Sequence, residues 1–132
     1  MLKNNSIVMI SDNTNARRGK IIQILGGSKR KYAFITDLVV LDIITKKRIG
    51  ARLILQKEIY LAFVSQVKCI FFRKNGIGIR FFRNRAVLFF RNNKEELECL
   101  GTRFYGPKLK EYHRVKFSKT LLLSEDRRKF LI

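Results

Sequence analysis

The residues best suited to chemistry in this chain are the bases between Asn13 and Thr36, a stretch that contains no acid. Its six bases are Arg17, Arg18, Lys20, Lys29, Arg30 and Lys31. Guanidinium and ammonium groups hold phosphate oxygens through charge-assisted hydrogen bonds. Because ordinary protein surfaces mix charges of both signs, a stretch of one sign favours binding to a polyanion over a merely solvated rim.

Two turns and one strand are expected to position these bases. Residues 12–15 (Asp-Asn-Thr-Asn) have side chains that bond their own backbone, which predicts a tight turn with Asn13 among the binding residues. Lys20–Leu25 is short, β-branched and bounded by turn residues, which predicts a strand. Gly26-Gly27 accepts positive φ and ends this strand before the basic tip. Tyr32 closes the tip, where it either stacks on an unpaired base or packs within the chain.

No pattern in the sequence predicts catalysis or a metal site. His113 is the single histidine, and no Ser or Cys nucleophile has a recognisable setting. Cys69 and Cys99 lack metal-ligand spacing and are expected to be reduced structural thiols. The main acidic cluster consists of Glu95, Glu96 and Glu98. It lacks a His or Asp ligand at regular spacing and favours a solvated loop, so we expect no enzyme, metal or cofactor.

The charge of the whole chain favours the same class of partner. Its 132 residues carry 29 bases against 10 acids, a formal charge of +19, while 46% of the residues are hydrophobic. The length predicts one domain with a core, and a compact domain so charged repels itself unless a partner neutralises it. Nucleic acid is the expected partner, ahead of an anionic membrane surface. No apolar run approaches the roughly 18 residues of a membrane helix, so no membrane insertion is expected.

Short apolar segments along the chain predict an all-β fold. The expected strands, besides the one already described, cover residues 7–10, 37–44, 58–72, 77–82 and 85–91. Asn75-Gly76 is a hairpin signal. Residues 101–107 predict an irregular loop, and residues 108–123 one or two short helices. Strands of this length and spacing indicate a small barrel.

Further bases and three Phe-Phe pairs accompany these strands. The additional candidate phosphate-binding residues are Lys46, Lys47, Arg48, Arg73, Lys74, Arg80 and Arg83. Because successive strand side chains point to opposite faces, one Phe of each pair should face the barrel core. The expected inward residues are Phe71, Phe81 and Phe89, and the outward ones are Phe72, Phe82 and Phe90. A partner, or the C-terminal segment of the chain itself, would cover the outward ones.

Three motifs occur in a fixed order along the chain. They are residues 11–33 (SDNTNARRGKIIQILGGSKRKYA), then Ile79-Arg80-Phe81 followed by Asn84 and Val87-Leu88, then residues 101–107 (GTRFYGP). Together they resemble the universal large-subunit ribosomal protein number fourteen family over about residues 6–124. Two departures stand out. The family's glycine in the first turn is Asn15, which tolerates left-handed backbone better than most residues, and the family's Asp-Gly after the second motif is Phe82-Arg83.

The resemblance implies a five-stranded barrel with short C-terminal helices, with residues 1–124 as a single domain and residues 125–132 as a basic tail. It implies a structural role in the large ribosomal subunit and in translation, through binding to large-subunit rRNA at the subunit interface and to neighbouring ribosomal proteins. Small-subunit rRNA and a ribosome-silencing factor are further implied partners. The residues that it places at subunit or protein interfaces are Thr102, Arg103 and Lys119.

Two questions remain open at the level of sequence. A free nucleic-acid chaperone or single-strand RNA- or DNA-binding barrel is the alternative function. The chain is rich in Ile, Lys, Phe and Asn, residues that A/T-rich codons encode, and poor in Ala and Pro. This composition favours a mitochondrial gene, with a plastid or an A/T-rich bacterium as alternatives.

Overall fold

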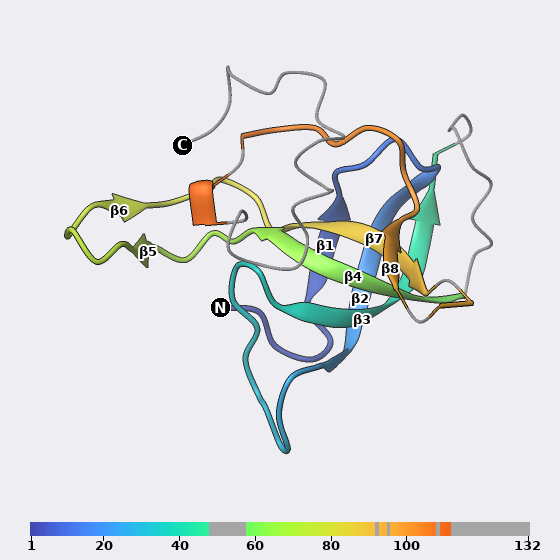
Figure 1. The fold of residues 1–132 in the computed structure, drawn as a ribbon, viewed down its shortest axis with the longest axis horizontal. Coiled ribbons are helices and arrows are strands. Elements are labelled where there is room, and N and C mark those ends of the chain that lie inside the picture. Colours follow the sequence, from blue (N-terminus) through green and yellow to red (C-terminus); the bar gives the residue numbers. More distant parts are fainter. Residues whose placement is uncertain (48–57, 92, 95, 108, 112–132) are drawn as a thin grey trace.

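The computed structural model describes residues 1–47, 58–91, 93–94, 96–107 and 109–111, which form an all-β fold (Figure 1). The strands are β1 (Ile7–Ile10), β2 (Ala16–Ile24), β3 (Leu38–Lys46), β4 (Ile59–Gln66), β5 (Phe71–Phe72), β6 (Gly78–Ile79), β7 (Arg85–Arg91) and β8 (Leu97–Cys99). Six of them form one sheet in the order β1-β2-β3-β4-β7-β8, and β1 also pairs with β7. This last pairing closes β1, β2, β3, β4 and β7 into the five-stranded barrel that the sequence predicted.

The closing strand β7 has two partners along one of its edges. β1 runs parallel to its beginning, with Met9 opposite Arg85 and Ile10 opposite Ala86. β8 runs antiparallel to its end, with Phe90 opposite Glu98. The expectation of a solvated acidic loop is therefore wrong for Glu98, because the alternating apolar side chains of the LEC segment pack toward the core.

The barrel interior is filled by alternate residues of the strands. In β3, Val39, Leu41 and Ile43 point inward and are buried. The rings of Phe63 and Phe89 meet edge to face with centroids 6.4 Å apart, on the opposite face of β4 and β7 from the inward Ala62 and Leu88. Each large side chain buried in this way contributes about 1.5–3 kcal/mol to folding. The barrel is thus a rigid base for the loops at its ends.

β5 and β6 leave the barrel and form a separate two-stranded ribbon (Figure 1). The predicted continuous strands over 58–72 and 77–82 are therefore wrong, because pairing of β4 with β7 ends at Gln66 and Arg85. The hairpin turn at Asn75-Gly76 is confirmed, since Gly76 has a φ of +86° and its N–H donates to the Arg73 carbonyl at 3.0 Å.

Register shifts in β2 determine which of its residues face outward. The pairing with β3 shifts between Ala16 and Arg18 and again between Ile21 and Gln23. A β-bulge sends two successive residues to the same side of a sheet. Both Arg17 and Arg18 are therefore exposed, which simple alternation along the strand would forbid.

The predicted helices over 108–123 and the tail at 125–132 fall almost wholly outside the described residues. Within the described part, Lys110 and Glu111 lie in a turn of 3-10 helix. No helix among the described residues is long and apolar enough to cross a membrane.

Candidate nucleic-acid interface

The turn at residues 12–15 joins β1 to β2, and Asp12 organises it. One carboxylate oxygen of Asp12 accepts from the Thr14 N–H at 3.1 Å and from the Thr14 hydroxyl. The other accepts from the Leu88 N–H of β7 at 3.0 Å, on the edge of β7 between its pairing with β1 and its pairing with β8. Burial raises the pKa of Asp12, against the lowering effect of these bonds and of Lys47. The predicted turn is confirmed, and it also seals the barrel.

Asn13 fastens this turn to the third motif. Its Oδ1 accepts from the N–H groups of Thr102 at 2.8 Å and Arg103 at 3.1 Å, while its Nδ2 donates to the Thr102 hydroxyl at 2.7 Å. The structure thus brings together residues that were predicted for two different surfaces. The side chain of Asn13 is committed within the chain, so we give it a structural role before any role in binding.

Asn15 replaces the family's glycine without using the left-handed backbone that the sequence led us to expect. The residues other than glycine with positive φ are Asn5, Lys29 and Thr36 within the described part, so Asn15 does not use left-handed backbone. Instead Asn15 is buried, and its carbonyl accepts a hydrogen bond from the Lys47 N–H at the end of β3. The turn persists without glycine because its backbone is ordinary at this position.

Acids outside the acid-free stretch meet two of the predicted phosphate-binding arginines. Arg30 pairs with Asp37 at 2.5 Å. Arg73 forms a bidentate ion pair with Glu111, at 2.6 and 3.3 Å. Both arginines are half-buried and hold local structure, so we exclude them from the principal binding surface.

Lys20 has an acidic neighbour as well. It lies opposite Asp42 across the β2–β3 pairing, so the two side chains share a face of the sheet. The segment that contains the bases of β2 has no acid in its sequence, but the folded sheet places Asp42 beside one of these bases.

Four arginines remain together on the outer face of β1, β2 and β7, and we call them the cationic band: Arg17, Arg18, Arg83 and Arg85. Met9 of β1 lies opposite Arg18 on one side and opposite Arg85 on the other. Directly paired residues point to the same face of a sheet, so these three side chains form a row. The Arg83 guanidinium reaches the Met9 sulfur at 3.8 Å and extends the row.

Arg85 is the member of the band that sequence analysis did not select. Burial, and secondarily the charge of Arg83, lower the pKa of the Arg85 guanidinium. Neither arginine forms a salt bridge with the described residues. The parallel pairing of β1 with β7 creates this cluster, and no local feature of the sequence predicts that pairing.

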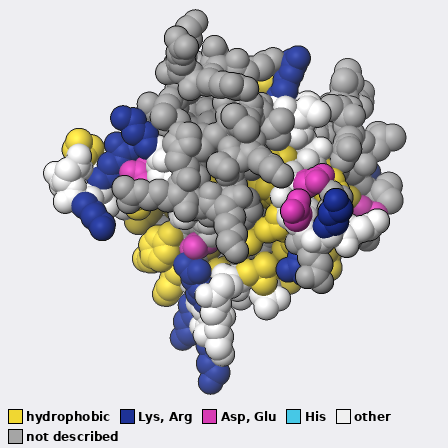
Figure 2. Space-filling model, in the orientation of Figure 1, with side chains coloured by type: hydrophobic (Ala, Val, Ile, Leu, Met, Phe, Trp, Pro, Cys, Tyr) yellow, Lys and Arg dark blue, Asp and Glu magenta, His cyan; other side chains and the backbone are white. Residues whose placement is uncertain are grey.

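The other predicted bases occupy separate projections. Lys29 and Lys31 are exposed at the tip of the β2–β3 hairpin, which projects at the bottom of Figure 2 as dark-blue side chains. β2 spans about 30 Å, so the tip lies well away from the cationic band. The remaining exposed bases are Lys46 and Lys47 at the end of β3, Lys74 at the ribbon turn and Arg80 after β6. Arg48 and Lys119 lie outside the described residues.

Tyr32 packs at the edge of the chain and not in its core, and stacking on an unpaired base stays a prediction. Its side chain is 38% exposed, so it is not a core residue. The Lys3 ammonium lies 5.3 Å from the centre of its ring, which is within cation–π range. One face of the ring thus already has a partner.

Of the three Phe-Phe pairs, only Phe81-Phe82 divides between buried and exposed as alternation predicts. The expected inward direction of Phe89 is wrong, because the pairing of β4 with β7 puts Leu88 on the barrel-interior face and Phe89 on the other face. Phe81 and Phe89 are buried, at 6% and 1% exposure. Phe72 and Phe82 are 68% and 95% exposed. The remaining two, Phe71 and Phe90, are half-buried.

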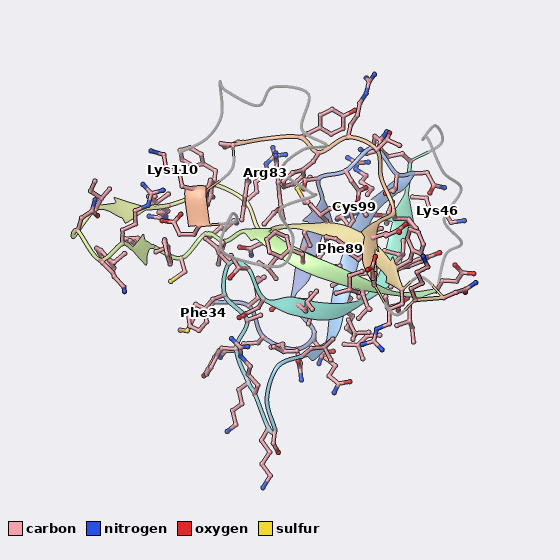
Figure 3. The ribbon with its side chains drawn as sticks, in the orientation of Figure 1. Phe34, Lys46, Arg83, Phe89, Cys99 and Lys110 are labelled. Carbon is pink, nitrogen blue, oxygen red and sulfur yellow. The ribbon has the colours of Figure 1, made fainter. Side chains whose placement is uncertain are left out.

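An apolar groove of about 210 Å³ lies beside Phe72. Its lining residues are Phe34, Ile35, Val67, Cys69, Ile70, Phe71 and Phe72. Phe34 and Lys46 lie on opposite sides of the barrel in Figure 3, so the groove is remote from the end of β3.

The two cysteines differ in their surroundings. Cys69 is exposed, which corrects its expected role as a structural thiol, whereas burial raises the pKa of Cys99 to about 12.

The three motifs on these loops and strands belong to one family, and the match extends along nearly the whole chain. The family model for ribosomal protein L14p/L23e matches residues 1–127. The chain belongs to this family. It is a structural protein of the large ribosomal subunit, and its family implies rRNA and other ribosomal proteins as partners. The family thus agrees with the resemblance seen in the motifs, and with the five-stranded barrel that the structure contains.

Proposed function

We propose that the chain binds large-subunit rRNA through the cationic band, near the interface with the small subunit. The observation that carries this proposal is the row of Arg18, Met9 and Arg85 with Arg83 beside it. Close like charges without an acid are unfavourable until an anion neutralises them. The bound phosphates would position the chain on the rRNA without reading its sequence.

The loop at residues 101–105 is the proposed contact toward the small subunit. Thr102 and Arg103 are exposed, and the Asn13 side chain fixes their backbone. A loop whose shape is fixed before binding loses less entropy on association. Small-subunit rRNA and a ribosome-silencing factor are the partners proposed for this loop, in line with the family resemblance.

A neighbouring ribosomal protein is the proposed occupant of the apolar groove beside Phe72. The groove is lined by apolar side chains and Cys69 alone. An apolar surface of this kind suits a protein side chain better than a phosphate backbone.

Sedimentation of the assembled particle separates this proposal from a free nucleic-acid chaperone. A tagged chain should migrate with the large subunit on a sucrose gradient and remain there at high salt. Release of the chain at high salt, with intact subunits, would support the chaperone instead. We further propose a mitochondrial ribosome, on the ground of the A/T-rich codon bias, and sedimentation of fractionated organelles tests this with the same tagged chain.

A further inference from the structure

Phe82 is the side chain that the fold of this chain explains least. It is 95% exposed, whereas its neighbour Phe81 is buried. Phe82 occupies the position where the family resemblance leads one to expect Asp, so the exposed ring is a departure of this chain. A single exposed apolar residue needs no explanation by itself, but its surroundings give this one a role.

The backbone on both sides of Phe82 is anchored. Phe81 inserts into the core, and the Asn84 side chain accepts from the Lys68 N–H at 2.9 Å. The Asn84 carbonyl also accepts from the Met9 N–H of β1 at 3.0 Å. The bend at residues 82–83 is therefore held in place, and the ring is presented to solvent before any partner arrives.

Positive charge surrounds this ring. Arg80 and Arg83 are exposed on either side of it, and the sequence from Ile59 to Asn93 contains no acid. Arg83 is itself a member of the cationic band. The apolar groove beside Phe72, in contrast, is lined by no charged side chain.

An exposed aromatic ring among cations matches the chemistry of an unpaired nucleotide. The base offers a flat π-face for stacking, and its phosphate offers a negative charge that neutralises the arginines. An apolar protein surface would cover the ring but would leave the arginines unneutralised.

We infer that Phe82 stacks on an unpaired rRNA base, while Arg83 holds the phosphate beside that base. This inference rests on the proposed function and adds a second kind of contact to it. Stacking tolerates any base, so the site selects an exposed single-stranded nucleotide rather than a base sequence.

Filter binding of the purified chain to an in vitro transcript of the large-subunit rRNA tests the inference. Phe82→Leu keeps an apolar side chain but removes the ring, and should weaken binding about tenfold. Phe82→Trp should bind as tightly as the wild type. Phe72→Leu is the matched control at the apolar groove, and should change the affinity less than twofold. The slope of log K against log salt should stay the same in all three variants, since none of them changes a charge.

The possible results separate this inference from the proposed function. If Phe82→Leu binds the transcript as the wild type does, stacking is wrong; if that variant is also lost from assembled subunits, Phe82 contacts a protein instead. If the wild type itself binds without salt dependence, the proposed rRNA contact fails and the inference fails with it. A tenfold loss in Phe82→Leu that Phe82→Trp does not share supports stacking.

Discussion

The carboxylate of Asp12 occupies a place in the sheet that a strand would otherwise fill. It satisfies the Leu88 N–H where β1 has already left β7 and β8 has not yet joined it. The next residue, Asn13, holds the loop that begins at Gly101. The most recognisable residues of the first motif thus stabilise the fold, and the arginines that follow them are exposed to solvent.

Gly101→Ala should destabilise the fold by about 1–3 kcal/mol, the usual cost of overpacking. A Cβ at this position would lie 2.8 Å from the Asn13 Oδ1 and 2.9 Å from the Asp12 Cβ. Urea unfolding measures the loss. Gly27→Ala is the matched control, because its Cβ would meet only Arg30 at 3.9 Å, and it should cost less than about 0.5 kcal/mol. Equal effects of the two substitutions would contradict the close packing at Gly101.

The raised pKa of Asp12 predicts a particular dependence of stability on pH. The folded-state pKa lies above the reference value of 3.8, so the folded chain binds the proton more tightly than the unfolded chain. The corresponding stability is complete below pH 3.8 and is lost as the pH rises through the folded-state pKa. Asp12→Asn cannot titrate. The excess stability of the wild type over this variant should therefore fall as the pH rises from the reference pKa of 3.8 through the raised folded-state pKa, and an excess that rises instead would show that the ionised form is favoured.

At the scale of elements, the β5–β6 ribbon is the part that no strand of the barrel pairs with. Pairing within the ribbon covers two residues of each strand, which alone is marginal in water. The ion pair between Arg73 and Glu111 ties it to the segment after the third motif. The ribbon therefore depends on a contact between two distant parts of the chain.

A double-mutant cycle on Arg73→Gln and Glu111→Gln should give a coupling energy of about 1 kcal/mol. Bidentate geometry raises the value above that of an ordinary surface pair, while partial exposure keeps it modest. Lys74→Gln, at the exposed turn of the same ribbon, is the control and should leave the unfolding free energy unchanged. A coupling energy near zero would mean that the ribbon is held by other contacts.

The elements that sequence analysis predicted well have local causes. β1 and β7 were predicted with their observed ends, because apolar residues flanked by polar ones mark them. The turn at Asn75-Gly76 and the turn at residues 12–15 also follow from the residues that form them. β8 was missed because three glutamates hid the alternation of Leu97 and Cys99, and the β2 bulges were missed because they depend on the pairing with β3.

The candidate site was harder to predict than the fold because its charges meet across the sheet. Asp37, Asp42 and Glu111 all lie outside the acid-free run that first marked the site. They meet or face bases only after the strands pair and the ribbon docks. Arg85 joins Arg18 through the closure of the barrel, which is a long-range event. Counting bases along the sequence therefore identified only part of the proposed surface.

At the scale of the whole molecule, a formal charge of +19 would make any RNA bind to some extent. Our proposal is narrower, namely that phosphates bind at the cationic band. A substitution must therefore be compared with another that removes the same charge elsewhere. Arg91 and Lys94 provide that comparison, because they are exposed at the far end of β7, near the partly buried Glu98 and the exposed Glu96.

The most direct test is a salt titration of rRNA binding by three proteins, namely the wild type, Arg18→Gln with Arg83→Gln, and Arg91→Gln with Lys94→Gln. If about six phosphates are neutralised, log K for the wild type should fall with log salt at a slope of roughly −4 to −5. The band variant should lose about 1.5 to 2 of that slope, while the control variant, which has lost the same charge, should keep it. Equal losses in the two variants would show that net charge alone drives binding and would contradict the cationic band as the rRNA site.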